Sequence, residues 1–392
     1  MAPHAEETVS AETLAPVLVP VSAAKLQATV APGEKDGYGT LFALKVDRDA
    51  EDGKKGHPAA RYPHYLPTWD AYEKDPPLEP RAHHDPGLDA DTAYPELLGA
   101  GTQLTNLTPT IGSEVRGIQL SSLGAAGRAQ LAHLVASRKV VAFRDQDFAD
   151  LPIADALDFG RSFGPLHVHP TAGVAAGYPE TLIVHRGAGD DSVDRYFAGR
   201  TSTVAWHSDV SYEAQPPAVT LLYALEKPVV GGDTLFADAV EAYNRLSPAF
   251  QQRLHGLRAV HSAVEQANGS LARGGLLRRD PVKNEHPIVR THPVTGEKGL
   301  FVNRGFTREI VGLKKEESDA LLNFLYDHLA YGADFHARVR WEDKTVVLWD
   351  NRVTQHSALV DWRNGERRHL ARITPTGERP VETPFVGAGR RN

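Results

Sequence analysis

Short runs rich in Val, Leu, Ile and Thr recur along the chain from about residue 104 onward. They predict strands over residues 140–143, 181–185, 219–225, 234–237, 299–303, 345–349 and 370–374. Apolar residues at helical spacing are fewer, and they predict helices over residues 126–138, 153–163 and 317–330. Many short strands separated by Gly and Pro turns predict a mainly β fold with flanking helices. We expect a β-sandwich or a jelly roll at its core.

The first hundred residues have a different pattern, because they contain 12 of the 27 prolines and many charged residues. Long regular elements are not expected there. We expect residues 1–100 to form a proline-rich N-terminal extension or arm, partly disordered over residues 1–35, and residues 101–392 to form one compact domain. The segment 61–91 carries aromatic residues that should pack on the main domain or on a neighbouring subunit, namely Tyr62, Tyr65, Trp69 and Tyr72.

Composition and charge narrow the class of protein. The apolar fraction of 41% and the charged fraction of 24% are those of a folded globular protein. The net charge of −7 argues against a general nucleic-acid binder, which needs excess Lys and Arg. No apolar run is long enough to cross a bilayer, and the acidic N-terminus resembles neither a secretory signal nor a mitochondrial transit peptide. We therefore expect a cytoplasmic protein with no nucleic-acid or membrane partner.

The chain has no Cys, which excludes disulfides, thiolate nucleophiles, iron–sulfur clusters and Cys-ligated zinc. Its 18 His, together with Asp and Glu, are then the available metal ligands. Nitrogen and oxygen ligands of this kind suit a harder metal than thiolates do. Metal chemistry is therefore expected where His and carboxylate residues come together.

The tetrapeptide 206–209 (Trp-His-Ser-Asp) is the strongest local candidate for a metal site. In an extended segment, residues i and i+2 point to the same side, so His207 and Asp209 can bind one ion. A third ligand is needed, and His356 follows the predicted strand 345–349 after a run of polar turn residues. Two His and one carboxylate leave adjacent metal positions open, which suits Fe(II) oxygenases that bind a 2-oxo acid and O2.

A basic cluster follows this third candidate ligand and contains Arg368 and Arg372. In a strand the two side chains point to the same side. A solvated surface is the simplest interpretation of two such arginines, but these lie between His356 and a predicted core strand. Because an unpaired buried charge is costly, inward arginines need anionic partners. We expect two anions, the carboxylate of a cosubstrate and the acid group of a substrate.

Between about residues 104 and 380 the chain resembles the TauD/TfdA family of Fe(II)/2-oxoglutarate-dependent dioxygenases, especially taurine dioxygenase and the fungal sulfonate dioxygenases. Several blocks in the same order carry the resemblance, at residues 163–170 (FGPLHVHP), 206–210 (WHSDV), 231–235 (GGDTL), 289–296 (VRTHPVTG), 305–307 (GFT) and 349–356 (WDNRVTQH). The resemblance implies a double-stranded β-helix (jelly roll) core. It also implies Fe(II), with 2-oxoglutarate and O2 as cosubstrates.

The resemblance further implies a role for each matching residue. The iron ligands, and with them the catalytic centre, correspond to His207, Asp209 and His356. Thr234 and Arg368 match the residues that hold the distal carboxylate of 2-oxoglutarate, for which a hydroxyl and a planar guanidinium are suitable donors. The residues that match the substrate pocket are the sulfonate-binding His169 and Arg372, the backbone N–H of Val210, and the aromatic wall Phe306.

Two positions near the substrate depart from taurine dioxygenase. Where that enzyme has a Tyr beside the amino group of taurine, the stretch 170–173 has none, and Thr203 takes the place of an Asn that contacts the same amine. The spacing from His356 to Arg368 is also one residue longer, while that from Arg368 to Arg372 is unchanged. We expect sulfonate binding to be retained, amine binding to be lost, and alkyl sulfonates to be preferred over taurine.

The remaining histidines near these blocks are interpreted as structural. His167 has i, i+2 spacing with His169 but no carboxylate partner next to it. His369 should point to the opposite face of the strand from Arg368. His286 and His292 flank a predicted strand, whereas His83 and His84, in the N-terminal arm, are expected to be solvated.

The implied function is hydroxylation of the carbon next to the sulfonate of an alkyl sulfonate. This reaction releases sulfite and an aldehyde, while 2-oxoglutarate becomes succinate and CO2. A related dioxygenase acting on alkyl sulfate esters or aryloxyalkanoates is the alternative within the enzyme class. Outside it, a non-catalytic jelly-roll binding protein or sensor and a structural zinc site are competing interpretations. The partner is expected to be a small anionic substrate, and a homo-oligomer of two or four copies is expected because family members commonly form them.

Overall fold

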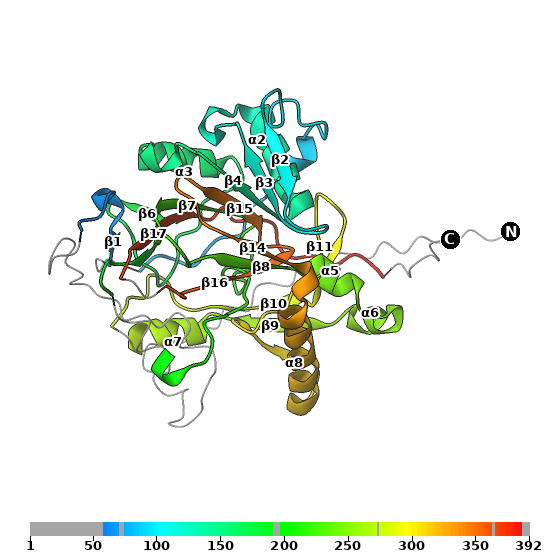
Figure 1. The fold of residues 1–392 in the computed structure, drawn as a ribbon. Helices are drawn as coiled ribbons and strands as arrows, with labels where there is room; N and C mark the ends of the chain where they lie inside the picture. The colour runs from blue at the N-terminus through cyan, green and yellow to red at the C-terminus, as the bar shows by residue number, and fades with distance from the viewer. Residues whose placement is uncertain (1–57, 70–73, 191–196, 273, 363–364, 386–392) are drawn as a thin grey trace.

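The computed structural model describes residues 58–69, 74–190, 197–272, 274–362 and 365–385 (Figure 1). The expected disorder of residues 1–35 lies outside the described residues. Within the described part, one large sheet and three smaller sheets form the body of the molecule.

The large sheet runs through the middle of the molecule and has nine strands within the described residues. Its strands in spatial order are β1 (Pro67–Thr68), β5 (Val174–Ala175), β6 (Tyr178–Arg186), β17 (Arg368–Ile373), β7 (Val219–Glu226), β15 (Val346–Asp350), β4 (Val140–Phe143), β3 (Ser113–Arg116) and β2 (Gln103–Asn106). Neighbouring strands are antiparallel except β3 and β4, which are parallel. Strand β17, which carries Arg368 and Arg372, lies between β6 and β7.

A smaller sheet faces the large one and consists of β14 (His336–Val339), β8 (Thr234–Asp238) and β16 (Thr354–Ala358). Side chains of the two sheets form an apolar cluster that includes Phe236, Val339 and Trp349. In Figure 1 this second sheet lies directly below the large one. Two sheets packed face to face in this way confirm the predicted mainly β fold with a jelly-roll core.

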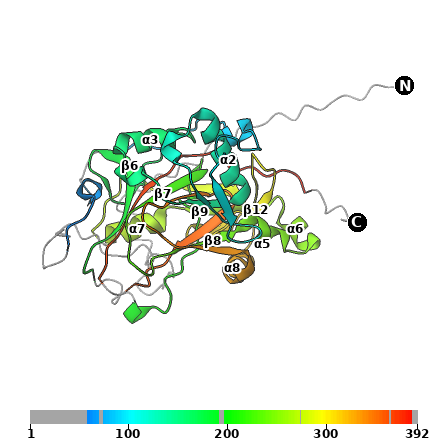
Figure 2. The same ribbon diagram turned by 45° about the horizontal axis from the view of Figure 1, so that its top comes forward.

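Helices cover the outer faces of this core (Figures 1 and 2). Two of them, α2 (Ala125–Arg138) and α3 (Ile153–Arg161), pack on the large sheet through a cluster that includes Leu131, Phe159 and Tyr223. Between β8 and β14 the chain forms α5 (Ala239–Asn244), α6 (Pro248–Leu254), β9 (Arg258–Ser262), α7 (Val264–Ala272), β10 (Lys283–Pro287), β11 (Val289–Thr291), β12 (Lys298–Leu300), β13 (Thr307–Ile310) and α8 (Lys315–Tyr331). Among the described residues, no helix combines the length and the apolar character that a membrane span requires.

The three predicted helices are confirmed with small differences at their ends, and each predicted strand has a counterpart. The strand predicted over 299–303 corresponds to β12, which already ends at Leu300. The hydrophobic pattern did not predict strands β1, β2, β3, β5, β9, β10, β13, β14 and β16, or the short helices α5, α6 and α7. The hydrophobic pattern does not reveal β16, because its buried positions hold the polar residues Thr354, Gln355 and His356.

The described part of the N-terminal arm packs along the body of the same chain. Tyr65 is fully buried, and its hydroxyl oxygen accepts a hydrogen bond from the Tyr223 hydroxyl in β7 (3.1 Å). Strand β1 pairs with β5, and the Asp85 carboxylate forms a buried ion pair with Arg352 (2.5 Å). Residues of the arm are therefore part of the same apolar core as the large sheet.

Candidate metal centre

The main chains of His207 and His356 lie side by side as an isolated antiparallel bridge. The His207 N–H donates to the His356 carbonyl (3.1 Å), and the His356 N–H donates to the His207 carbonyl (2.9 Å). His356 belongs to β16, while His207 lies in the segment before β7. The Ser208 hydroxyl extends this contact by donating to the Thr354 carbonyl (2.7 Å). Hydrogen bonds that involve the main chain thereby hold together two segments that are far apart in the sequence.

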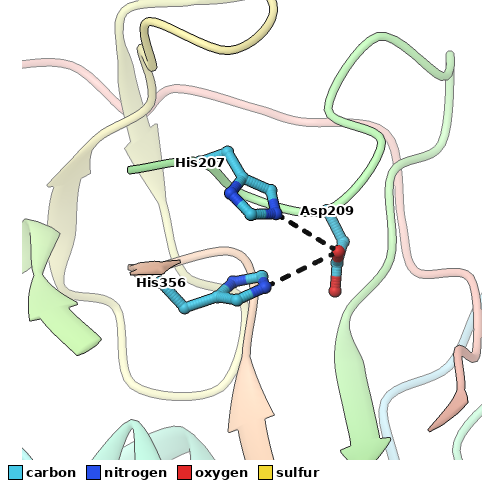
Figure 3. A group of neighbouring side chains, drawn as sticks. All are labelled: His207, Asp209 and His356. Atoms are coloured by element: carbon cyan, nitrogen blue, oxygen red, sulfur yellow. Dashed lines mark ion pairs between the residues drawn. The ribbon is translucent and has the colours of Figure 1, made fainter. Parts of the chain in front are cut away.

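Three buried side chains converge at this bridge, those of His207, Asp209 and His356 (Figure 3). One potential ligand atom from each lies within 4.8 Å of the others. Asp209 Oδ1 is 3.9 Å from His207 Nε2 and 3.8 Å from His356 Nε2. His207 and Asp209 point to the same side, as expected for residues i and i+2 of an extended segment. The structure therefore brings together the three residues that the sequence predicts as metal ligands.

Both histidines have the form that a metal ligand needs. His207 Nδ1 lies 2.8 Å from the Ala205 carbonyl, which can only accept, so Nδ1 carries the proton and Nε2 keeps its lone pair. Burial lowers the pKa of both rings, that of His356 to about 3, so both are neutral near pH 7. The His356 ring packs against Trp349 (centroids 4.8 Å apart) and Phe236 (6.0 Å). Two neutral imidazoles and one carboxylate are a donor set that fits Fe(II).

The Asp209 carboxylate is held by two donors. Arg372 Nη1 donates to Oδ1 (2.6 Å), and the Thr220 hydroxyl donates to Oδ2 (3.3 Å). Asn351 orients the second donor, because its Nδ2 donates to the Thr220 hydroxyl oxygen (2.6 Å). Burial raises the pKa of Asp209, but the neighbouring Arg372, followed by the two histidines, outweighs it and lowers the pKa to about 2. The carboxylate is therefore ionised, as a metal ligand must be.

Arg368 lies on β17 with its guanidinium buried, and its Nε donates to the Gly232 carbonyl (3.0 Å). Its Nη2 is buried and has no hydrogen-bond partner within the part of the chain that the structure describes. Burial lowers the pKa of Arg368 to about 10, which still leaves the group charged near pH 7. A buried cation without an anion in contact is costly, so this position fits an anion supplied by a ligand.

Thr234 and Arg368 both lie beside Trp341. Trp341 Nε1 donates to Thr234 Oγ1 (3.2 Å), and the Trp341 ring lies 6.0 Å from the Arg368 guanidinium. Gly232 has φ +71°, and a Cβ there would lie 3.1 Å from Arg368 Cδ. Glycine therefore allows both the left-handed backbone and the close approach of Arg368 at this point.

The His169 ring is a neutral hydrogen-bond donor. Its Nδ1 accepts from the main-chain N–H groups of Thr171 (3.2 Å) and Ala172 (3.1 Å), so the proton is on Nε2. Burial, followed by the nearby Arg372, lowers the pKa of His169 well below its usual value. His169 therefore offers an N–H donor without carrying a charge.

Val210 directly follows Asp209 and has φ +37°, a left-handed conformation that a β-branched residue rarely adopts. Its side chain packs with Phe306 and Tyr212 in a small apolar cluster. Phe306 also lies edge-on to the His207 ring, with centroids 6.2 Å apart. Backbone strain of this kind persists where the surrounding packing holds it, and it is concentrated at functional sites.

Sequence reasoning missed the residues that support the site, namely Thr220, Trp341 and Asn351. Asn351 lies in the block at residues 349–356, but its role, like those of Thr220 and Trp341, depends on contacts with distant segments that no local pattern reveals. Among the histidines interpreted as structural, His369 Nε2 lies 2.9 Å from the Tyr65 carbonyl, and His292 Nε2 lies 2.9 Å from the Asp350 carboxylate. His167 Nε2 lies 3.0 Å from the Glu213 carboxylate, a partner that the sequence did not reveal.

Several known proteins are similar to this chain over most of its length. An alpha-ketoglutarate-dependent sulfonate dioxygenase of Saccharomyces cerevisiae is 45% identical over 360 residues, which cover 89% of this chain and 87% of the yeast protein. An alpha-ketoglutarate-dependent sulfate ester dioxygenase of Pseudomonas putida is 31% identical and covers 69% of this chain and 88% of its own. Alpha-ketoglutarate is another name for 2-oxoglutarate.

The fold has a solved counterpart in a putative alpha-ketoglutarate-dependent taurine dioxygenase from Burkholderia xenovorans. The TM-score is 0.59 at 31% identity, and the match covers 71% of this chain and 94% of the bacterial one. Residues 103–374 match the model of the family described as taurine catabolism dioxygenase TauD, TfdA family. This range includes all three residues of the triad as well as Arg368 and Arg372. The chain therefore belongs to the TauD, TfdA family of dioxygenases.

Proposed function

We propose that this protein is an Fe(II)- and 2-oxoglutarate-dependent dioxygenase that hydroxylates the carbon next to the sulfonate of alkyl sulfonates. The reaction takes one O2 and one 2-oxoglutarate, which becomes succinate and CO2. The hydroxylated sulfonate then breaks down to sulfite and an aldehyde. The observation that carries the proposal is the pair of guanidiniums on β17, Arg368 and Arg372, beside a triad of metal-ligand type. The name of the yeast sulfonate dioxygenase supports it.

His207, Asp209 and His356 would hold the iron. When bound, the iron supplies the activation of O2 with electrons drawn from the 2-oxo acid. Arg368 and Thr234 would bind the distal carboxylate of 2-oxoglutarate through guanidinium and hydroxyl donors. Among the described residues Arg368 Nη2 has no hydrogen-bond partner, which supports this assignment because a carboxylate there offsets the cost of burying the cation.

Arg372, His169 and the N–H of Val210 would bind the sulfonate. Arg372 supplies the positive charge, and the other two supply neutral N–H donors to the remaining oxygens. Because His169 Nδ1 is already bonded to two loop amides, donation from Nε2 does not depend on protonation of the ring. Arg372 also contacts Asp209 (2.6 Å), so a sulfonate bound to it would lie beside the triad. The carbon next to sulfur would then lie at the side of the metal ligands.

The positions that match the amine contacts of taurine dioxygenase favour a substrate without an amine. The loop 170–173 has the sequence Pro-Thr-Ala-Gly, which offers no acidic or phenolic side chain, and Thr203 is buried where taurine dioxygenase has Asn. An amino group placed there would lose hydration without gaining the Tyr and Asn partners that taurine dioxygenase offers. We therefore propose that alkyl sulfonates are preferred over taurine.

The test is an assay with Fe(II), ascorbate, O2 and 2-oxoglutarate in which butanesulfonate is compared with taurine. With butanesulfonate we expect equal amounts of succinate and sulfite, and for taurine a kcat/KM lower by about tenfold or more, as for one lost hydrogen bond to a charged group. A clear preference for taurine would contradict the proposed substrate class.

The alternatives predict other products. Turnover of an alkyl sulfate with release of sulfate, without turnover of sulfonates, would favour the sulfate ester reaction that the Pseudomonas putida relative is named for. Release of a phenol from an aryloxyalkanoate would favour a dioxygenase that acts on aryloxyalkanoates. Absence of any substrate-dependent succinate would favour a binding protein.

The proposal includes a cytoplasmic location, an assembly of two or four copies, and an arm formed by residues 1–100. Phe324 and Tyr331 on α8 are exposed and would be available for a contact between subunits. Light scattering of the purified protein tests the number of copies, and a monomer would contradict it.

A further inference from the structure

Two adjacent arginines, Arg278 and Arg279, bind the loop that carries His169. Both are buried and lie in the segment between α7 and β10. The Arg278 main-chain N–H donates to the Pro170 carbonyl (2.7 Å), and its Nη1 donates to the His169 carbonyl (3.0 Å). Arg279 Nη2 donates to the Val168 carbonyl (2.8 Å). The pair therefore binds main-chain carbonyls on both sides of His169 as well as that of His169 itself.

This loop has little regular structure to hold it. Residues 167–173 form no helix or strand before β5 begins. Because the His169 ring accepts hydrogen bonds from the Thr171 and Ala172 amides, the ring and the loop move as one unit. Arg278 Nη1 also donates to the Ala172 carbonyl. Without such contacts the loop would sample several conformations, and ordering them again would cost entropy when a substrate binds.

The N-terminal arm supports the arginine pair from another side. The Asp75 N–H donates to the Arg278 carbonyl (2.7 Å), and Lys74 Nζ forms an ion pair with Asp280 Oδ1 (2.5 Å). Arg279 is in addition 3.4 Å from the buried Glu213 carboxylate. Arg278 therefore connects the arm to the His169 loop, and Arg279 connects the same loop to Glu213.

We propose that Arg278 and Arg279 are positioning residues, which hold the His169 loop so that the Nε2 of His169 faces the anionic head group of the substrate. The inference rests on the proposed function, because it concerns the shape of the sulfonate site. A guanidinium presents several donors in a rigid fork and binds several carbonyls of one loop at once, which the single ammonium of Lys does less well. The N-terminal arm then has a role in substrate binding, because it supports this pair.

The experiment compares Arg278→Met with Arg278→Lys in the full-length protein, with butanesulfonate as the substrate. For Arg278→Met we expect the KM for butanesulfonate to rise by about tenfold or more, while the KM for 2-oxoglutarate stays unchanged and kcat falls little. Calorimetric titration of butanesulfonate into the anaerobic Fe(II) and 2-oxoglutarate complex should show the same rise in Kd. Arg278→Lys should recover part of the loss, since the charge and the N–H donors of one ammonium group remain.

Arg144→Met is the matched control. Arg144 is also buried, donates to a main-chain carbonyl (Arg340, 2.8 Å) and pairs with Glu114, so its loss should lower Tm without changing the KM for butanesulfonate. The proposal is wrong if Arg278→Met changes this KM no more than Arg144→Met does, or if it raises both KM values equally. If the unmodified protein forms no succinate with butanesulfonate, the proposed function fails, and this inference fails with it.

Discussion

His207 and His356 exchange both main-chain hydrogen bonds, at 3.1 and 2.9 Å, and their ring centroids lie 4.2 Å apart. The relative position of the two histidines is therefore set by backbone pairing, with their side chains projecting from a short antiparallel bridge. Asp209 is not needed to form this bridge. Replacing the carboxylate should accordingly remove the chemistry while leaving the scaffold in place.

Asp209→Ala should abolish turnover. The change removes the carboxylate of the triad and leaves Arg372 without the partner that it contacts at 2.6 Å. Two neutral imidazoles alone hold Fe(II) weakly, so we expect succinate release to fall by about a hundredfold or more. Circular dichroism should show that the folded state persists.

Metal-dependent stability gives a second readout for the same variant. An ion that binds only the folded state raises Tm in a concentration-dependent way. Anaerobic Fe(II) or Mn(II) should therefore raise the Tm of the unmodified protein but not that of Asp209→Ala. An equal shift in both proteins, or undiminished turnover by the variant, would refute the role of Asp209.

Arg368→Met should raise the KM for 2-oxoglutarate more than the KM for the sulfonate. A lost charge-assisted hydrogen bond costs about 1.5–3 kcal/mol, which corresponds to roughly 10- to 100-fold in affinity. Arg368→Lys, which keeps the charge but not the fork, should have a smaller effect. Steady-state kinetics with each substrate varied in turn measure this, and a rise in the sulfonate KM alone would mean that Arg368 and Arg372 have been assigned in the wrong order.

A buried ionic network joins the two ends of the described chain to the core and should make stability depend on acid pH. Glu378 Oε1 accepts from Arg290 Nη2 (2.6 Å), and Glu378 Oε2 lies 3.4 Å from Arg352 Nη1. Arg352 also pairs with Asp350 and Asp85 at 2.5 Å each. Burial raises the pKa of Glu378, but Arg290 and Arg352 outweigh it and lower the pKa from 4.5 to about 2.

The sign of the effect follows from this lowered pKa. The folded state binds a proton at Glu378 less readily than the unfolded state, so the stabilisation is present above about pH 4.5 and is lost as the pH falls toward 2. The stabilisation that ionised Glu378 contributes at neutral pH is on the order of 3 kcal/mol. Urea unfolding between pH 5 and 3 should show a smaller loss of stability per pH unit for Glu378→Gln than for the unmodified protein. An equal loss of unfolding free energy per pH unit in the two proteins would argue against this role of Glu378.

Elements with a self-contained hydrophobic pattern could be predicted from the sequence. Helix α8 is an example, because Leu322, Leu325 and Leu329 recur at helical spacing and are all buried. Strand β7 is another, since nearly every residue in it is apolar and buried. Strand β16 could not be found in this way, because its buried residues are polar. Their burial depends on pairing with β8, which lies in a distant part of the chain.

The features of the candidate site also fall into two groups, those that the local sequence predicts and those that depend on contacts between distant segments. The sequence by itself determined that metal ligands must be nitrogen and oxygen donors, since there is no Cys. It also determined that His207 and Asp209 point to the same side, since alternation along an extended segment is a local property. Only the tertiary structure decided that Arg372 contacts Asp209, that the bridge sets His356 beside His207, and that the N-terminal arm supports Arg278. These contacts join segments far apart in the chain. The local periodicity of apolar and polar residues reports which face of an element is buried and does not report which distant segment covers it.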